Sequence, residues 1–501
     1  MQRNVGESVK DRLIPALAAS ALIAVLAASL AGPALSDEVF TLEAARLSGQ
    51  ALWRHLEADV HPPLYYYLIK GWLALAGADL AALRAFSLLM AALAALLAGS
   101  VLPRQAAGRG WAAWFFAADG IVLVMSIYGR MYTLLAALCL LAWLASDRHL
   151  REGGRGWAVF AGATVAAGLC THHFFALYLV SLAAWLILAH RGVALRLLPG
   201  WGVGTAIWAL VWGRTAWEQL TRRPQHLAWV QPAAFEKWAE VAGAHVIFFA
   251  AALPLGLAAF AWRRRTRNEW PAESRAAAVA AAITLALPGA ISVWKPVLNP
   301  RFTIIAAPFL AVALAPLGRL TAGVLPVTAF AAAAAWLWWP GTQTSCTSAE
   351  AARQLAATTT SADTVLFCRL TRKPVEYHWR NPAAQRRSFP AEIDSHPGYE
   401  GKQPREQLLQ EARSLAASLN GRVFILADTG RLAPQILLRA LEEAGFRPRE
   451  PLLACSSAGK HYFDRLLVFD PPVRQAESPS GGPPGTGSPP PDPAARAYAP
   501  R

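Results

Sequence analysis

Long apolar segments recur between Leu13 and Trp339, and few of them contain a charged residue. A helix of about 20 apolar residues crosses the roughly 30 Å hydrocarbon core of a bilayer. Only 16% of the 501 residues are charged, whereas a typical soluble chain has about 25%. The pattern therefore predicts a polytopic all-α membrane protein and argues against a soluble helical protein with an apolar core.

About twelve segments fit this description. They are Leu13–Leu35, Leu64–Ala76, Leu83–Leu102, Trp111–Ile127, Tyr132–Ala145, Trp157–Cys170, Phe174–Ala189, Leu197–Trp212, Val246–Trp262, Ala276–Val293, Phe302–Leu317 and Thr321–Trp339. Leu13–Leu35 is expected to be retained as a signal anchor. Leu64–Ala76 is short for a full crossing, which leaves the number of crossings between His61 and Arg104 open.

The net charge is +15, and the basic residues fall mostly in short loops between the apolar segments. Such loops stay on the cytoplasmic side, so these residues indicate orientation and give no reason to expect nucleic-acid binding. The run Arg263, Arg264 and Arg265 is the strongest cytoplasmic marker. The opposite, extracytoplasmic ends then collect most of the unusual polar residues of the chain.

Composition divides the chain into three parts. Residues 1–340 are expected to form the transmembrane domain. Residues 341–470 alternate short apolar strands with helical patterns, which predicts a small soluble α/β domain outside the cytoplasm. Its expected elements are helices at Ala349–Ala357 and Pro434–Ala444 and strands at Thr364–Cys368, Arg422–Ala427 and Tyr462–Phe469. Residues 471–501 are rich in Pro, Gly and Ser and are expected to be a disordered tail.

Five cysteines are present. Cys139 and Cys170 lie in apolar segments and are expected to be small core residues. Cys346, Cys368 and Cys455 lie in the C-terminal part, where an extracytoplasmic location allows one disulfide and leaves one thiol. The sequence does not choose the pair.

Two adjacent acids, Asp37 and Glu38, follow the first apolar segment directly. Charge is retained at such places mainly for function, and a carboxylate just outside the membrane can act as a general base or bind a metal. The alternative is an acidic start for an amphipathic surface helix over Glu38–Leu56, but capping needs only one acid. We therefore expect a catalytic role above all for Asp37, with Glu38 as a second candidate.

Asp59 and His61 precede two prolines and open the second apolar segment. The prolines separate that helix from the preceding one. A helix start explains the prolines but leaves the histidine unexplained. Both Asp59 and His61 are therefore candidate substrate-binding residues.

These motifs together resemble a known family. Asp37-Glu38, then Asp59-Val60-His61-Pro62-Pro63-Leu64-Tyr65-Tyr66, then Leu83-Arg84, look like the protein O-mannosyltransferase and aminoarabinose-transferase superfamily, whose members are membrane glycosyltransferases of the GT-C fold. Tyr128-Gly129-Arg130-Met131-Tyr132, Thr171-His172 and Pro300-Arg301-Phe302 extend the likeness, which is nearest to the bacterial branch named for rhizobial lipopolysaccharide-core transferases. An acid that two other branches have near Thr133 is missing, which puts the acceptor in doubt.

The resemblance implies a sugar donor carried on polyprenyl phosphate and implies Asp37 as the base that deprotonates the acceptor hydroxyl. The leaving phosphate needs cationic or hydrogen-bonding partners. Candidates at extracytoplasmic helix ends are Arg130, Tyr132, Lys295 and Arg301. His172 matches a family position and is a further candidate substrate-binding residue, with a satisfied interfacial histidine as the alternative. For each cation, snorkelling at the interface is the alternative. Whether a divalent cation takes part stays open. Asp37, Glu38, His61 and His172 are the candidate ligands, but no spacing here is diagnostic of a metal site.

The sequence thus predicts an integral membrane glycosyltransferase of the cell membrane that acts on an extracytoplasmic glycan, lipid or protein. A transporter or flippase of a lipid-linked glycan is the rival interpretation. Transporters place charge near the bilayer midplane, whereas here the apolar segments contain little charge. A non-catalytic scaffold leaves Asp37, Glu38 and His61 without an explanation.

Overall fold

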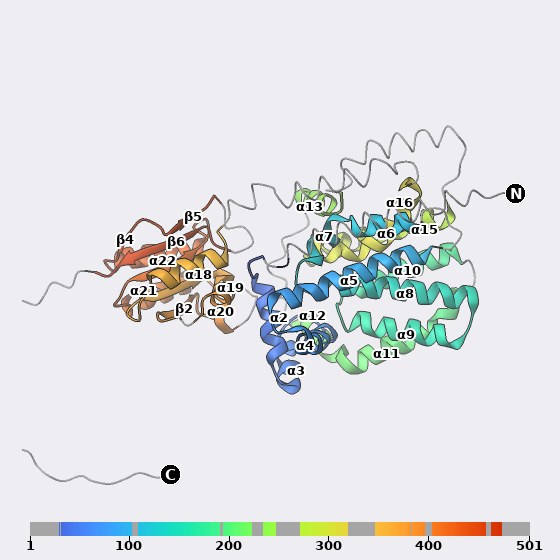
Figure 1. Cartoon of the computed structure of the whole chain (residues 1–501), viewed down its shortest axis with the longest axis horizontal. Coiled ribbons are helices and arrows are strands. Elements are labelled where there is room, and N and C mark those ends of the chain that lie inside the picture. The colour runs from blue at the N-terminus through green and yellow to red at the C-terminus, as the bar shows by residue number, and fades with distance from the viewer. Residues whose placement is uncertain are drawn as a thin grey trace, which may run out of the picture.

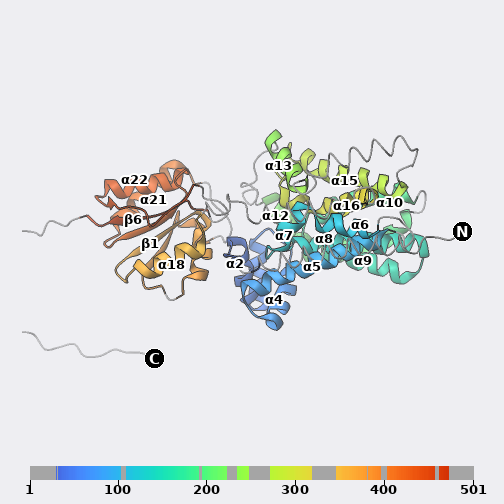
Figure 2. The same cartoon turned by 45° about the horizontal axis from the view of Figure 1, so that its top comes forward.

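The chain folds into a body of helices and a separate β-sheet unit, which lie at opposite ends of the long axis (Figure 1). The computed structural model describes residues 30, 32–102, 109–190, 194–222, 234–246, 271–318, 346–380, 382–395, 403–456 and 462–472. We call residues 30–318 the helical part and residues 346–472 the sheet unit. Helices α2, α3 and α4 lie at the end of the helical part nearest the sheet unit (Figures 1 and 2).

Most described residues of the helical part are helical. The helices are α2 (Ser36–Arg46), α3 (Gly49–Ala58), α4 (Leu64–Ala76), α5 (Leu80–Val101), α6 (Arg109–Ala117), α7 (Gly120–Ser126), α8 (Tyr132–Glu152), α9 (Arg155–Leu169), α10 (Phe175–Ala189), η2 (Ala194–Leu197), α11 (Leu198–Trp208), η3 (Ala209–Gly213), α12 (Arg214–Arg222), α13 (Phe235–Val246), α15 (Ala272–Ile291), η5 (Pro300–Ala306) and α16 (Ala307–Gly318). Helices α5 and α8 pack side by side, with α6 against α5 and α9 against α8, and α15 packs against α10 and α16.

Four described helical stretches are long and apolar enough to cross a membrane: Leu80–Val101, Tyr132–Glu152, Ala194–Gln219 and Ala272–Ile291. Phe175–Ala189 and Pro300–Pro316 are apolar but shorter. The mostly helical prediction is confirmed, whereas a count of twelve spans is not. Three predicted spans, Leu13–Leu35, Val246–Trp262 and Thr321–Trp339, lie almost wholly outside the described residues.

The predicted span Trp111–Ile127 was wrong as a single helix. The chain leaves the helical conformation at Ala118 and Asp119, between α6 and α7. The Asp119 carboxylate accepts a hydrogen bond from Ile121 N at 3.0 Å and so caps α7. A short acidic side chain that bonds to nearby backbone competes with helix continuation, which explains the break.

A helix over Glu38–Leu56 was also wrong, because the chain forms α2 and α3 there. The break falls at Leu47 and Ser48, and Ser48 Oγ accepts a hydrogen bond from Ala51 N at the start of α3. Lys70 Nζ donates to the carbonyl oxygens of Ala45 and Leu47, at 3.0 and 2.6 Å. The ammonium thus satisfies the carbonyls exposed at the end of α2.

The sheet unit is a six-stranded sheet with helices. Its elements are α18 (Ser348–Thr358), β1 (Thr364–Cys368), η7 (Arg369–Thr371), α19 (Arg372–His378), β2 (Gln385–Phe389), α20 (Glu392–Ser395), α21 (Arg405–Ala417), β3 (Val423–Ala427), α22 (Leu432–Glu443), β4 (Arg447–Pro448), β5 (Leu453–Ala454) and β6 (Arg465–Asp470). The strand order is β2-β1-β3-β6-β4, and β5 pairs with β6. Strand β1 is parallel to β2 and β3, whereas β6 is antiparallel to β3, with Val423 opposite Phe469.

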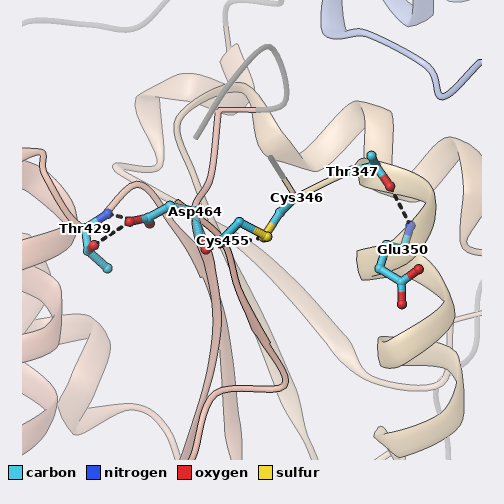
Figure 3. The surroundings of a disulfide bond; sticks show 6 residues. All are labelled: Cys346, Thr347, Glu350, Thr429, Cys455 and Asp464. Atoms are coloured by element: carbon cyan, nitrogen blue, oxygen red, sulfur yellow. Dashed lines mark hydrogen bonds between the residues drawn. A yellow bond between two sulfur atoms is a disulfide. The ribbon is translucent and has the colours of Figure 1, made fainter. Parts of the chain in front are cut away.

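The expected elements of the sheet unit are all present within a few residues of their predicted bounds. Every residue of β1 and of β3 is buried, as expected of central strands. Thr347 Oγ1 caps α18 by accepting from Glu350 N at 3.2 Å (Figure 3). Cys346 and Cys455 form the disulfide, and Cys368 is a buried thiol outside it.

The sheet unit contacts the helical part next to the acidic pair. Ala34 N donates to His378 Nε2 at 3.0 Å, and Ser348 Oγ donates to the Ala34 carbonyl at 3.0 Å. Lys373 forms an ion pair with Glu43 of α2. These contacts place the sheet unit against the segment that leads directly into Asp37.

Candidate active site

Asp37 lies in the first turn of α2 and accepts two side-chain hydrogen bonds on one carboxylate oxygen. Tyr128 Oη donates to Asp37 Oδ2 at 2.5 Å, and Arg301 Nη1 donates to the same oxygen at 3.2 Å. The Asp37 side chain keeps 20% of its surface exposed. Since both bonds in the described part of the chain end on Oδ2, Oδ1 is the oxygen left for a hydroxyl group.

Arg130 forms a second layer behind Asp37. Its Nη1 lies 3.3 Å from the Asp37 carbonyl, 3.2 Å from Thr41 Oγ1 and 3.3 Å from Tyr66 Oη. The residue is 4% exposed. A buried guanidinium beside a carboxylate supplies positive charge where solvent screens it poorly.

The charge around Asp37 sets its protonation state. Burial raises the pKa of Asp37, but the charges of Arg130 and Arg301 and the hydrogen bond from Tyr128 outweigh burial, and the pKa lies below the usual aspartate value. Asp37 is therefore an ionised carboxylate at neutral pH. In that state it can accept a proton.

Glu38, the second acid, is fully buried and bonded to groups that hold the site together. Its Oε1 accepts from Arg84 Nε at 2.8 Å and from Gly129 N at 2.9 Å. Its Oε2 accepts from Arg84 Nη2 at 2.6 Å and from Leu35 N at 3.1 Å. With four donors on two oxygens, this geometry favours a structural role for Glu38 over the catalytic role considered from the sequence.

Arg84 uses all of its N–H groups in the same arrangement. Besides Glu38, it donates to the carbonyl oxygens of Leu30, Gly32 and Pro33 at 2.7–3.0 Å. A buried ion pair is tolerated when hydrogen bonds satisfy both partners in this way. The pair ties the start of α5 to the segment before α2, and so fixes where Asp37 emerges.

Gly129 explains how Tyr128 and Arg130 reach Asp37. A Cβ atom at this position would lie 2.5 Å from the Leu83 side chain and 3.4 Å from Glu38 Oε1. Only glycine lets the turn after α7 pack this closely against α2 and α5. The hydrogen bond from Gly129 N to Glu38 then holds Tyr128 and Arg130, its neighbours, beside Asp37.

His61 and His172 lie together although more than a hundred residues separate them. Leu64 N donates to the Cys170 carbonyl at 2.9 Å, which joins the Pro62-Pro63 turn to the end of α9. The His61 and His172 ring centroids are 5.7 Å apart. Burial lowers the pKa of His61 well below the usual value and that of His172 to about 3, so both rings are neutral at pH 7.

Asp59, the other candidate of this segment, lies two residues before His61. Burial raises its pKa to about 6, and the charge of Arg130 opposes that rise. The buried side-chain atoms without a hydrogen-bond partner in the described part of the chain include Asp59 Oδ2, Tyr65 Oη, Arg130 Nε, Thr133 Oγ1 and His172 Nε2. Buried polar atoms normally have partners, so this group points to a polar ligand or to water.

The remaining candidate residues from the sequence are Tyr132, Arg301 and Lys295. Tyr132 hydrogen-bonds to the Arg301 side chain, and its ring centroid lies 5.8 Å from that of His172. Asn299 Oδ1 accepts from Arg301 N at 3.1 Å and caps η5, which orients Arg301 toward Asp37. Lys295 is half-buried and follows α15.

Sequence reasoning assigned no site role to Tyr128, Tyr66 or Arg84. Tyr128 touches Asp37, Tyr66 touches Arg130, and Arg84 holds Glu38. All three residues belong to the motifs that suggested the family. Polar side chains in or next to apolar segments often have a function, and this property could have identified them.

One observation bears on whether the site could bind a metal ion. Among the residues that the structure describes, no group of three or more His, Cys, Asp or Glu side chains is arranged to hold a metal ion. Asp37, Glu38, His61 and His172, the ligands considered from the sequence, therefore do not converge on one point.

Two solved structures match the whole architecture. ArnT from Cupriavidus metallidurans in the apo state superimposes with a TM-score of 0.55 at 14% identity, over 91% of this chain and 97% of that one. The same protein bound to undecaprenyl phosphate gives a TM-score of 0.56 at 13% identity, with the same coverage. The chain has the fold of these structures. This confirms the GT-C fold expected from the resemblance.

The likeness does not extend to sequence. No protein-family model matches the chain, and no curated protein matches it. Identities of 13–14% establish the fold and leave the branch, the sugar and the acceptor to other arguments.

Proposed function

We propose that the chain is an integral membrane glycosyltransferase that moves a sugar from a polyprenyl-phosphate donor to an extracytoplasmic glycan, lipid or protein acceptor. The observation that carries the proposal is the Asp37 carboxylate, partly exposed and ionised, with Arg301 and Arg130 beside it. A base next to two cations suits a reaction that takes a proton from one substrate and releases a phosphate from the other. The undecaprenyl phosphate bound to ArnT supports a donor of this class.

The reaction is a single displacement at the anomeric carbon. The acceptor hydroxyl gives its proton to Asp37 Oδ1, and its oxygen forms the new bond to the anomeric carbon. The bond from that carbon to the phosphate oxygen breaks, and the polyprenyl phosphate leaves with the bonding electrons. Arg301 and Arg130 stabilise the phosphate charge.

Phosphate binding also strengthens the base. Before the donor binds, Arg301 is paired with Asp37, and its charge helps to keep the Asp37 pKa low. A bound phosphate competes for Arg301 and adds negative charge nearby, and both effects raise the Asp37 pKa. Asp37 thus becomes a better proton acceptor when a donor is in place.

Two features support an active site outside the cytoplasm, in the cell membrane. The basic loops indicate that the polar ends lie on the extracytoplasmic side. The sheet unit, which docks next to Asp37, contains the Cys346–Cys455 disulfide. Disulfides persist mainly in oxidising compartments.

The test compares purified wild type with Asp37→Asn, which keeps the shape of the side chain and removes the base. With undecaprenyl-phosphate sugars and a membrane lipid extract, we expect the variant to lose sugar transfer by about a hundredfold or more. Binding of undecaprenyl phosphate, measured as a shift of the melting temperature, is the control and should persist in the variant. Equal transfer by the two proteins would show that Asp37 is not the base. Movement of lipid-linked glycan across proteoliposomes without a new glycosidic product would favour the transporter instead.

A further inference from the structure

Three buried polar side chains outside the candidate site are joined by hydrogen bonds. His245 Nδ1 lies 2.9 Å from Asp119 Oδ2, and His245 Nε2 lies 2.9 Å from Thr303 Oγ1. We call Asp119, His245 and Thr303 the buried network. The elements that carry these residues, α13, α7 and η5, pack against one another, and α13 lies beside α7 in both views (Figures 1 and 2).

The buried network lies in surroundings where polar groups are costly. Its three residues are 0–4% exposed, and Asp119 and Thr303 lie in segments predicted to be membrane spans. Ionisable residues in such segments usually have a function. Stability alone is a weak reason to keep a buried acid and a histidine, since apolar residues of similar volume often serve as well. Thr303 is completely buried, so its hydroxyl group is not placed to attack a substrate.

One end of the buried network fixes the turn that carries Arg301. Thr303 Oγ1 donates to the Pro300 carbonyl at 2.7 Å, so its oxygen is left to accept from His245 Nε2. Arg301 lies between Pro300 and Thr303 in η5, and its Nη1 donates to Asp37 Oδ2 at 3.2 Å. The position of η5 therefore decides whether Arg301 reaches Asp37.

The other end of the buried network fixes the helix that leads to Tyr128. Asp119 Oδ1 accepts from Ile121 N at 3.0 Å and caps α7, while Asp119 Oδ2 faces His245. Helix α7 has seven residues, and Tyr128 follows it closely. A helix this short moves as a unit, so a shift of its capped start displaces Tyr128. Tyr128 Oη is the second donor to Asp37 Oδ2, at 2.5 Å.

We propose that the buried network positions both side chains that bond Asp37 Oδ2. His245 is its centre, because it joins the start of α7, which leads to Tyr128, to η5, which contains Arg301. Asp119, His245 and Thr303 are thus positioning residues that act through Tyr128 and Arg301. This inference rests on the proposed function and deepens it by naming what holds the base in its surroundings.

The test is Thr303→Val, which keeps the shape of the side chain and removes the hydroxyl group. Thr284→Val is the matched control: Thr284 is also completely buried, but its hydroxyl group bonds to the Ala280 carbonyl of its own helix, α15, at 2.7 Å. We expect Thr303→Val to lower kcat/KM for sugar transfer by about ten- to a hundredfold, because small displacements of catalytic groups are costly. Thr284→Val should stay within about twofold of wild type.

Two readouts separate positioning from a loss of folded protein. Burial raises the pKa of Asp37, and the charges of Arg130 and Arg301 with the hydrogen bond from Tyr128 bring it below the usual value. Displacing Arg301 and Tyr128 raises the pKa of Asp37, so the acid limb of the kcat/KM profile of Thr303→Val should move to higher pH. The limb should stay in place in Thr284→Val. Thr303→Ser, which restores the hydroxyl group, should return the rate to within about twofold of wild type.

A second variant tests the other end of the network. Asp119→Asn keeps an oxygen to cap α7 and removes the charge that faces His245, so it should lower kcat/KM and move the acid limb in the same direction. This variant carries the test if Thr303→Val does not fold. In a double-mutant cycle, Thr303→Val should cost much less in an Arg301→Lys background than in wild type, because Thr303 acts through Arg301.

The outcomes distinguish this inference from the proposed function. If wild type transfers sugar and Thr303→Val behaves like Thr284→Val, the positioning role is wrong and the proposed function stands. A loss in Thr303→Val with the acid limb in place and losses that multiply fully in the cycle would also contradict it, since both indicate a structural role. If wild type transfers no sugar from any polyprenyl-phosphate donor, the proposed function fails and this inference fails with it.

Discussion

The acids Asp37 and Glu38 are neighbours in the sequence but lie in different surroundings. Asp37 points to Tyr128 and Arg301 and keeps part of its surface exposed, whereas Glu38 is buried and bonded by Arg84 and Gly129. Neighbouring residues in the first turn of a helix project in different directions. The pair therefore places a reactive carboxylate beside the carboxylate that holds its surroundings together.

The ionised form of Asp59 is expected to destabilise the folded state. Its pKa is raised by burial to about 6 in the folded chain, so the folded state binds a proton more tightly than the unfolded state does. Its contribution is fully present at low pH and is lost as pH rises from about 4 to about 6. We expect Asp59→Asn to raise the melting temperature at pH 7.5 by a few degrees and to lower sugar transfer at the same time.

Glu38→Gln is the matched comparison for Asp59→Asn. It removes one charge of a buried ion pair and leaves Arg84 uncompensated, so we expect destabilisation by about 3–5 kcal/mol at the same pH. The two variants should thus move the melting temperature in opposite directions. If Asp59→Asn melted lower than wild type, Asp59 would be a structural residue.

At the scale of elements, glycines decide how closely α9 and α11 approach. A Cβ atom on Gly162 would lie 2.6 Å from the Gly200 carbonyl oxygen, and one on Gly200 would lie 2.7 Å from the Ala158 carbonyl oxygen. Small residues let helix backbones pack directly against each other, as is common between membrane helices. The sequence showed small residues in both segments but not that these particular ones face each other.

Gly162→Ala should separate α9 from α11 and destabilise the protein by about 1–3 kcal/mol. Gly202→Ala, on α11, is the control, since a Cβ atom there meets nothing within 4 Å. Alanine is the better helix former, so this variant should be neutral or slightly stabilised. Melting temperatures in detergent measure both, and equal values for the two variants would argue against close backbone packing.

At the scale of the whole molecule, the proposed site depends on two parts that meet at Ala34. His378 Nε2 accepts a hydrogen bond from Ala34 N, so this nitrogen has no proton. The sheet unit and the helical part are otherwise joined by few described bonds, among them the Lys373–Glu43 ion pair. Docking should therefore depend on pH.

Burial and, after it, the charge of Arg84 lower the pKa of His378 below its usual 6.5. The docked state then binds a proton less readily than the released state, so docking weakens as pH falls below about 6.5. We expect faster hydrogen exchange in α18 and α19 at pH 5 than at pH 7.5, after correction for intrinsic rates.

His378→Gln provides the control, because its side-chain oxygen can accept the same bond and does not titrate. Exchange in this variant should change less with pH than in wild type. An identical pH response in the two proteins would assign the effect to another group.

Local sequence properties determined the broad character of this protein. The length of apolar segments, the charge of loops and the pattern of strands depend on residues close together in the chain. These properties predicted the helical fold and the alternating C-terminal elements, and they drew attention to the acidic pair. Only the tertiary structure decided the partners, because these come from distant positions: Tyr128 is 91 residues from Asp37, and Arg301 is 264 residues away. The same reason separates the role of Asp37 from that of Glu38 and selects Cys455 as the disulfide partner of Cys346. Which groups share a buried space depends on how the elements pack, and no local pattern contains that information.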